Sequence, residues 1–466
     1  ASNWTAGKGA FAFKATEDSM MYAIFLALTS RARISIAARR IAATCLLATG
    51  VPWLCAGAGI ARSESPLPFA EALRIGEQRS AQLVASERSI DAARERAVAG
   101  AQLPDPVLRA GVDNLPINGA DQFSLTRDFM TMRRIGVVQE LTGSEKRKLR
   151  RLRGERAVER EQALKNAATA RLRQELAAAW LERYFAMQTS QLQASLLGEV
   201  NLQIQTLESG IRSGRTSAAE LRATQMVALQ TEDQLASSRQ QERAATQLLR
   251  RWLGDDAMRL PESPPDTEVL PAGTPEDLAR LTHHAELAVA IKDEALAQSE
   301  VRLAQRSKTA DWTFEVAYQQ RGSAYSDMVS FGVSIPLPLF ARDRQDRDIL
   351  ASQAGLAQAQ ATRQDIERLH RAELQSVLED WQSLNRRIAT LRTALLPLAR
   401  DRIELTLASY RSGTATLAQV LEARRAEVDA RQQVLSLRRE GARRWAKLNF
   451  QIVDAPGSAN HEGDGK

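Results

Sequence analysis

The chain has 466 residues, of which 5% are aromatic and 26% are charged, and its formal net charge is +7. Few aromatic residues and much alanine, leucine, glutamine, glutamate and arginine favour long helices packed side by side over a thick globular core. Six of the basic and two of the acidic residues lie within residues 1–58, so the remainder is only mildly basic. Basic and acidic residues also alternate along the chain, which argues against a nucleic-acid-binding surface.

Both cysteines, Cys45 and Cys55, lie near the N-terminus, and the four histidines form no cluster with metal-ligand spacing. The sequence contains no glycine-rich phosphate loop, nucleophile elbow or zinc-protease motif. We therefore expect no enzyme activity, no cofactor and no bound metal.

Two pairs of side chains could ligate a metal, although neither pair belongs to a recognised metal-ligand motif. Met130 and Met132 carry thioethers, which suit Cu(I) and Ag(I). His283 and His284 are adjacent at the expected start of a helix. Packing or lipid contact for the methionines, and surface exposure for the histidines, are the favoured interpretations.

Residues 20–61 have the pattern of a secretory signal peptide, and residues 1–19 then read as upstream sequence. Several arginines precede the apolar run Ile41–Leu54, and Ala56–Ala58 fits a small-residue cleavage site. The apolar run is too short to cross a bilayer, which needs about 20 residues. We predict export, with lipid attachment at Cys55 as an alternative fate of the segment.

Residues 62–260 follow a plan of helix, β hairpin, long helix, tip and return helix. The expected elements are a helix at 68–103, strands at 107–112 and about 123–141, a helix at about 145–212 and a return helix at about 218–254. The long helix spans on the order of 100 Å, more than a globular domain of this size requires.

Residues 275–453 repeat this plan after a linker at 261–274, and a disordered tail at 454–466 follows. The expected elements are a helix at 275–308, strands at about 312–319 and 329–335, a long helix at about 343–411 and a return helix that ends near Trp445.

The two expected tips share an Arg-Ser-Gly sequence followed by hydroxyl residues, and Gly214 and Gly413 stand 199 residues apart. Glycine ends a helix because it adopts positive φ, and a following serine or threonine can cap the next helix. The tip residues are Arg212, Ser213, Gly214, Arg215, Arg411, Ser412, Gly413 and Thr414.

The expected strands alternate apolar and polar residues, which indicates a sheet with one apolar and one polar face. A soluble sheet would need a second layer over the apolar face, and this remains an alternative. A transmembrane barrel covers that face with lipid and leaves no open edges. Four strands cannot close a barrel, so we expect three protomers to supply twelve.

The second long helix carries an apolar stripe with the 3.5-residue period of a supercoil. Its members are Val377, Trp381, Leu384, Ile388, Leu391, Leu395 and Leu398. Gly198 and Pro397 each lie 16 residues before a tip glycine and predict a bend or a change of packing there. A plain coiled-coil rod is the alternative, but it would have no β hairpins.

The duplicated plan resembles the TolC-type outer membrane efflux proteins over roughly residues 68–453. The resemblance includes Gly332–Phe340 (GVSIPLPLF) and Tyr410-Arg411-x-Gly413 followed by Val420-Leu421-x-Ala423. Within the family, Asp113–Pro116 and Phe123–Gly136 are similar to the heavy-metal (CzcC/CusC-type) branch.

The resemblance implies a mainly α-helical homotrimer with a 12-stranded β-barrel in the Gram-negative outer membrane and an α-helical tunnel in the periplasm. It implies two partners, a periplasmic adaptor (membrane fusion) protein and an inner-membrane pump of the resistance-nodulation-division (RND) type. The chain would be a passive conduit for heavy-metal cations. The tips would contact the adaptor.

The resemblance also places constriction residues six and nine positions after a tip glycine, which here are Glu220, Gln419 and Glu422. Threefold symmetry would make each a ring, and carboxylate rings favour cations. Arg212, Arg215 and Arg411 are candidate partners for the carboxylates. Solvent-exposed helix-face positions are the simpler interpretation of Glu220 and Glu422.

Three alternatives stay open at this point. A multidrug channel or a type I secretion channel would share the fold and differ only in cargo. A periplasmic coiled-coil scaffold or adaptor without a pore belongs to a different class.

Overall fold

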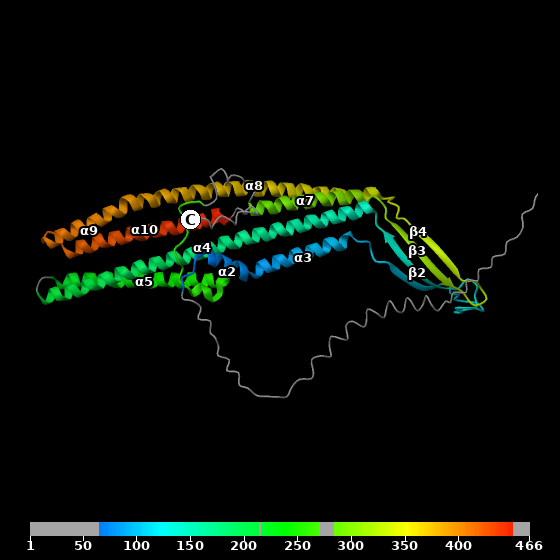
Figure 1. Cartoon of the computed structure of the whole chain (residues 1–466), viewed down its shortest axis with the longest axis horizontal. Helices are drawn as coiled ribbons and strands as arrows, with labels where there is room; N and C mark the ends of the chain where they lie inside the picture. The colour runs from blue at the N-terminus through cyan, green and yellow to red at the C-terminus, as the bar shows by residue number, and fades with distance from the viewer. Residues whose placement is uncertain (1–64, 214–215, 271–283, 451–466) are drawn as a thin grey trace, which may run out of the picture. The chain divides into compact units, whose positions relative to one another are not determined.

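The computed structural model describes residues 65–213, 216–270 and 284–450 (Figure 1). The chain divides into two units, residues 1–63 and 64–466, and every described residue belongs to the second. The signal peptide, both cysteines and the tail therefore lie outside the described residues. None of the helices in the described part combines the length and apolar composition that crossing a membrane requires.

The first repeat has the predicted order of elements. It comprises α2 (Phe69–Arg79), α3 (Ala81–Ala101), β1 (Val107–Asp113), β2 (Met132–Leu141), α4 (Ser144–Arg212), α5 (Ala218–Leu253) and the short 3-10 helix η1 (Gly254–Met258). The 69 residues of α4 form one uninterrupted helix, as predicted for this stretch.

The second repeat has the same order. It comprises α7 (Ala285–Arg306), β3 (Trp312–Gln320), β4 (Met328–Ser334), η3 (Ala341–Asp343), α8 (Gln345–Thr390), the π-helical turn η4 (Leu391–Leu395), α9 (Leu396–Arg411) and α10 (Leu417–Phe450). Residues 275–283 of the predicted first helix lie outside the described residues.

The predicted single helix at 68–103 is wrong in one respect, because the chain breaks at Ser80. The backbone of Ser80 is extended, with φ −71° and ψ 105°. Its hydroxyl accepts a hydrogen bond from the N–H of Leu83 at 3.3 Å and thereby caps α3. Serine competes with helical hydrogen bonding in this way, so two helices replace one.

The second strand also begins later than predicted, at Met132 rather than near Phe123. Asp128 Oδ2 accepts hydrogen bonds from the backbone N–H groups of Met130 and Thr131, both at 3.0 Å. These bonds hold the segment in a turn, so its N–H groups do not join the strand pairing.

The four strands form one antiparallel sheet in the order β1-β2-β3-β4. The β2–β3 pairing joins the hairpins of the two repeats and places Ile135 opposite Tyr318 and Val137 opposite Val316. The predicted two hairpins thus become a single sheet, with β1 and β4 at its edges.

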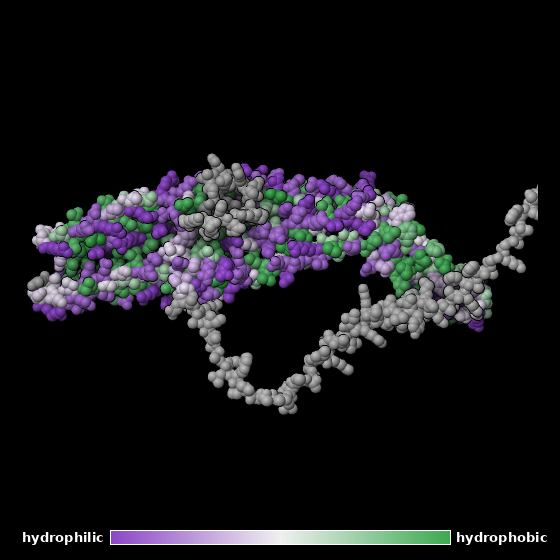
Figure 2. Space-filling model, viewed as in Figure 1, coloured by the Kyte–Doolittle hydropathy of each residue, from purple (hydrophilic) through white to green (hydrophobic). Residues whose placement is uncertain are grey.

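The sheet has the predicted apolar face and polar face. One row across the apolar face is Leu108, Val137, Val316 and Phe331, and these side chains are 47–80% exposed. On the other face, Glu315 forms ion pairs with Arg109, at 3.7 Å, and with Arg134. Figure 2 shows hydrophobic side chains gathered over the strands where they leave the helices.

The two repeats meet in one aromatic core. Helix α4 packs against α2, α3, α5, α7 and α10, and α8 packs against α7 and α10. Trp180 of α4 and Trp445 of α10 are fully buried, and the ring of Phe69 lies between them at centroid distances of 5.3 and 6.1 Å. This cluster joins the first and last described helices to the centre of α4.

The described part of the predicted linker, residues 261–270, pairs with Leu67 of the first repeat at Pro261 and contacts the second repeat farther along. The indole N–H of Trp381 donates to the carbonyl of Thr267 at 3.0 Å, and that of Trp445 donates to Val269 at 2.9 Å. Residues 271–274 of the linker lie outside the described residues.

Pro397 changes the second long helix as predicted, and the change is a π turn at Leu391–Leu395. Proline lacks an N–H group, and its ring clashes with the carbonyl four residues earlier in an α-helix. A π turn accommodates one additional residue and relieves this clash. At Gly198 the helix α4 continues without a break, so the bend or change of packing predicted there stays a prediction.

The π turn shifts the predicted apolar stripe. Leu384 and Ile388 are buried as predicted. Leu395, the last residue of the turn, is 40% exposed, and beyond the turn Leu398 is 65% exposed while Ile403 is buried instead. The extra residue of the π turn rotates α9 relative to α8, so the regular 3.5-residue period does not continue toward the tip.

Candidate functional site

The first tip joins α4 to α5, and a capping box at its described residues begins α5. Ser217 Oγ accepts a hydrogen bond from the N–H of Glu220 at 3.2 Å, and Glu220 Oε2 accepts one from the N–H of Ser217 at 3.5 Å. The hydroxyl of Thr216 donates a hydrogen bond to the carbonyl of Leu207 at 3.2 Å, which holds the tip against the end of α4. Gly214 and Arg215 lie outside the described residues.

The second tip joins α9 to α10 with the predicted glycine turn. Gly413 has φ +81°, a conformation that glycine adopts without a Cβ penalty. Its N–H donates to Tyr410 at 3.0 Å, and the N–H of Thr414 donates to Ser409 at 2.9 Å. These bonds satisfy the last carbonyls of α9.

Two of the three constriction candidates have the same local role in the two repeats. Gln419 Oε1 accepts a hydrogen bond from the N–H of Thr416 at 2.9 Å, and Thr416 Oγ1 accepts one from the N–H of Gln419 at 3.3 Å. This is the capping box that Glu220 forms in the first tip. The position six residues after each tip glycine therefore starts the return helix.

The third candidate, Glu422, is paired within its own hairpin. Its carboxylate lies 3.0 Å from Nη2 of Arg402 on α9, and both side chains are more than half exposed. The predicted partners lie elsewhere: Arg212 donates to Ser209 at 3.0 Å, and Arg411 makes no hydrogen bond or ion pair with any residue that the structure describes.

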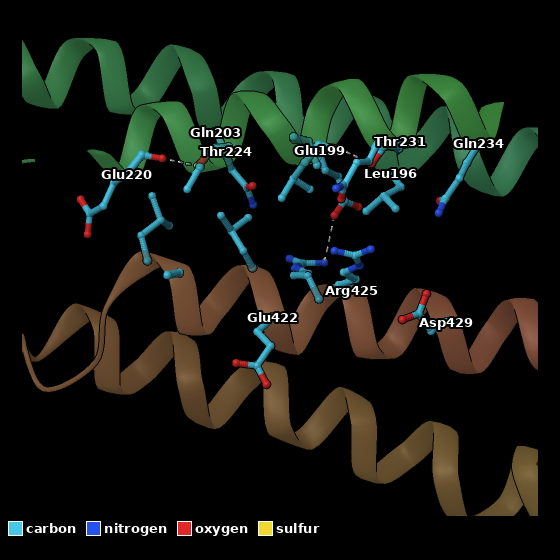
Figure 3. A pocket seen from close by; sticks show the side chains of 18 of the residues that line it. Leu196, Glu199, Gln203, Glu220, Thr224, Thr231, Gln234, Glu422, Arg425 and Asp429 are labelled. Atoms are coloured by element: carbon cyan, nitrogen blue, oxygen red, sulfur yellow. Dashed lines mark hydrogen bonds and ion pairs between the residues drawn. The ribbon is translucent and has the colours of Figure 1, made fainter. Parts of the chain in front are cut away.

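A cavity of about 250 Å³ separates the two hairpins below their tips (Figure 3). Helices α4, α5 and α10 line it, and both Glu220 and Glu422 belong to its wall. The apolar part of the wall comprises Leu196, Val200, Val227, Leu417 and Leu421. Glu422 nevertheless points toward α9 and away from the other hairpin (Figure 3), and Gln419 does not line the cavity.

An ion pair crosses this cavity between Glu199 of α4 and Arg424 of α10, at 3.7 Å. Farther from the tips the two repeats are in direct contact. Gln193 is 1% exposed, and its amide donates to Oε1 of Gln432 at 3.0 Å. The two hairpins are thus joined at Gln193, and the cavity lies between them on the side of this contact that is nearer the tips.

The described tip residues present charge and hydroxyl groups to solvent. The exposed residues are Arg212, Ser213, Arg411, Ser412, Gly413 and Thr414. The hydroxyls of Ser412 and Thr414 also donate to the carbonyl of Ser409, so local hydrogen bonds hold this turn.

The structure indicates no metal centre within the residues that it describes, since these contain no group of three or more possible His, Cys, Asp or Glu ligands. Met130 is 46% exposed and lies two residues before β2. His284 is buried, contrary to the expected surface position, and its ring packs against that of His370 with the centroids 3.9 Å apart and the planes tilted by 30°. His283 lies outside the described residues.

The second repeat matches the family model "Outer membrane efflux protein" over residues 279–451. No curated protein matches the chain. Solved structures share its fold. The outer membrane protein VceC from Vibrio cholerae is 18% identical, with a TM-score of 0.66 over 83% of this chain and 95% of VceC.

Two further structures agree with this comparison. The outer-membrane channel OprN is 19% identical, with a TM-score of 0.65 over 83% of this chain and 90% of OprN. CusC is 17% identical, with a TM-score of 0.60 over 82% of this chain and 91% of CusC. The fold is therefore that of the outer membrane channels, and the family-model match supports the TolC-type outer membrane efflux family.

Proposed function

We propose that this chain is the channel subunit of a tripartite efflux system and acts as a homotrimer in the Gram-negative outer membrane. The observation that carries the proposal is the sheet, whose apolar face stays exposed in the single chain. Lipid would cover that face. Three copies would pair β1 of one protomer with β4 of the next and close twelve strands into a barrel.

The helices would form the conduit on the periplasmic side, and the exposed tips would bind the adaptor that links the channel to an RND-type pump. Glu220, Gln419 and Glu422 lie just beyond the two tips, so threefold symmetry would arrange each as a ring at that end. Rings of Glu220 and Glu422 would favour cations in the conduit. The pump would supply the energy.

The proposed cargo is a heavy-metal cation, which is supported by the similarity of Phe123–Gly136 to the heavy-metal branch. A multidrug channel would share this fold, because a conduit takes its specificity from its pump. A susceptibility panel on a deletion strain separates the two. Sensitivity confined to Cu, Ag, Zn, Co or Cd supports metal export, and sensitivity to antibiotics and detergents supports multidrug export.

Assembly is tested by fractionating cells that express the full chain. Heat-modifiable trimers in the outer membrane fraction are expected, and a soluble periplasmic monomer would contradict the channel and favour a scaffold without a pore. For the adaptor, a photo-crosslinking residue at Ser412 should capture it. The same residue at Gln358, which is exposed on α8, should not.

A further inference from the structure

A second cavity, of about 230 Å³, lies where the sheet meets the helices. Its wall comprises Lys146 at the start of α4, residues Ser307–Asp311 ahead of β3, residues Pro336–Phe340 after β4, and Arg344 with Gln345 at the start of α8. This cavity is separate from the site at the tips, because the whole length of α4 lies between them.

One side of this cavity is apolar and faces outward. Leu337, Leu339 and Phe340 are 72%, 78% and 73% exposed. They continue the apolar face of β4, on which Phe331 is 80% exposed. Three large exposed side chains in succession are unfavourable in water, and their position next to the sheet suits contact with acyl chains.

The other side carries charged and polar groups. Lys146 pairs with Asp311 at 2.6 Å, and Lys308 pairs with Asp346 at 2.5 Å. The guanidinium of Arg344 is exposed and forms no ion pair with any residue in the described ranges. Beside it, Oε1 of Gln345 is buried and accepts no hydrogen bond from the described part of the chain. The cavity thus offers one uncompensated cation and one acceptor without a donor.

The surroundings add positive charge to this side. Residues 144–153 of α4 contain six basic residues and one acidic residue. A helix N-terminus already carries partial positive charge, so these cations do not stabilise the helix. Four of the six are paired with carboxylates, whereas Arg147 and Arg150 form no ion pair with any described residue. These two arginines add positive potential beside the apolar surface, and an anion with an apolar tail complements both.

We propose that this cavity binds one anionic phospholipid of the leaflet that faces the helices. The phosphate lies at Arg344, and a headgroup hydroxyl donates to Gln345 Oε1. An acyl chain follows Leu337 and Leu339. The inference rests on the proposed function, because that function places the sheet in the membrane and the cavity at the membrane surface.

Native mass spectrometry of the full chain in detergent tests the site, with palmitoyl-oleoyl phosphatidylglycerol and phosphatidylcholine as probes. Phosphatidylglycerol should bind saturably, to one molecule per chain, and at least fivefold more tightly than phosphatidylcholine. Arg344→Gln should weaken phosphatidylglycerol binding by about fivefold, the effect of one basic residue near a lipid surface. Leu339→Asn should weaken the binding of both lipids.

The matched control is Arg368→Gln, an exposed arginine farther along α8, which should bind phosphatidylglycerol as the parent does. Equal binding of the two lipids by the parent, or equal effects of Arg344→Gln and Arg368→Gln, would overturn the lipid site. Either result alongside outer membrane trimers leaves the channel function intact. A chain that never reaches the outer membrane overturns both proposals.

Discussion

Glu422 of α10 and Arg402 of α9 form an ion pair at 3.0 Å, which links the two helices of one hairpin and involves no residue of the α4–α5 hairpin. Because both side chains are more than half exposed, the pair contributes little stability. We predict that Glu422→Gln changes the free energy of unfolding by less than about 1 kcal/mol. In planar bilayers it should shift the reversal potential toward weaker cation selectivity.

Glu404→Gln provides the control for this experiment, because Glu404 is an exposed carboxylate on the same hairpin with no ion pair among the described residues. It should leave both selectivity and stability unchanged. Equal selectivity of Glu422→Gln and the parent channel would place Glu422 on a solvated helix face outside the constriction.

The contact between the repeats at Gln193 predicts a larger effect on stability. Gln193 is buried, and its amide bonds to Gln432 across α4 and α10. Gln193→Ala removes this bond and leaves a small cavity, so it should destabilise the fold by about 1–3 kcal/mol. Denaturant unfolding measures the change. Gln191→Ala, at an exposed position of the same helix, should cost less than about 0.5 kcal/mol.

The carboxylate of Glu71 predicts a dependence of stability on pH. Arg259 donates hydrogen bonds to it, with the closer at 2.8 Å, and this contact holds the pKa of Glu71 below its usual value of 4.5. The folded state therefore binds the proton less readily than the unfolded state does. The resulting stabilisation is complete above pH 4.5 and is lost as the pH falls through the lowered pKa.

Glu71→Gln should accordingly lower the melting temperature at pH 7, and the mutant and parent should converge as the pH falls below 4.5. Calorimetry across this range measures the difference. Glu87→Gln breaks an exposed ion pair with Lys165 and should change the melting temperature little at any pH. A constant difference between Glu71→Gln and the parent would assign the effect to packing instead.

The sequence predicted the features that local periodicity encodes, and missed those that depend on distant partners. Alternation located the strands, and the tip glycine with its hydroxyl neighbours located Gly413. The packing of Phe69 between Trp180 and Trp445 was not predictable, because these residues are remote in sequence and share no pattern. The ion pair of Arg402 with Glu422 was missed for a related reason, because the two residues lie on different helices on either side of the Gly413 turn.

The long apolar stripe shows a second limit of sequence patterns. Its regular spacing predicted Leu395 and Leu398 at the packed seam, where the structure exposes them. Pro397 was recognised as a point of change, but a pattern does not reveal whether proline kinks a helix or inserts a residue. In the structure an additional residue is accommodated in the π turn, and Ile403 is buried in the core as a result.

The β2–β3 junction provides the last prediction, because it alone joins the hairpins of the two repeats in the sheet. Gly136 lies opposite Ala317, and a Cβ added at Gly136 would stand 2.7 Å from the Cβ of Ala317 and 3.0 Å from the carbonyl oxygen of Val316. Backbone lies on that side, so neighbouring side chains cannot relieve the overlap by changing rotamer.

Gly136→Ala should therefore destabilise the sheet by about 1–3 kcal/mol and reduce the yield of heat-modifiable trimers. Gly332→Ala is the matched control, because its added Cβ would lie 3.5 Å from the Cβ of Glu315, an ordinary contact. Both variants replace a strand glycine by alanine, so they share any effect on the unfolded chain. Equal trimer yields from the two would show that assembly tolerates a wider β2–β3 spacing. A loss confined to Gly136→Ala would show that assembly depends on the close approach of these strands.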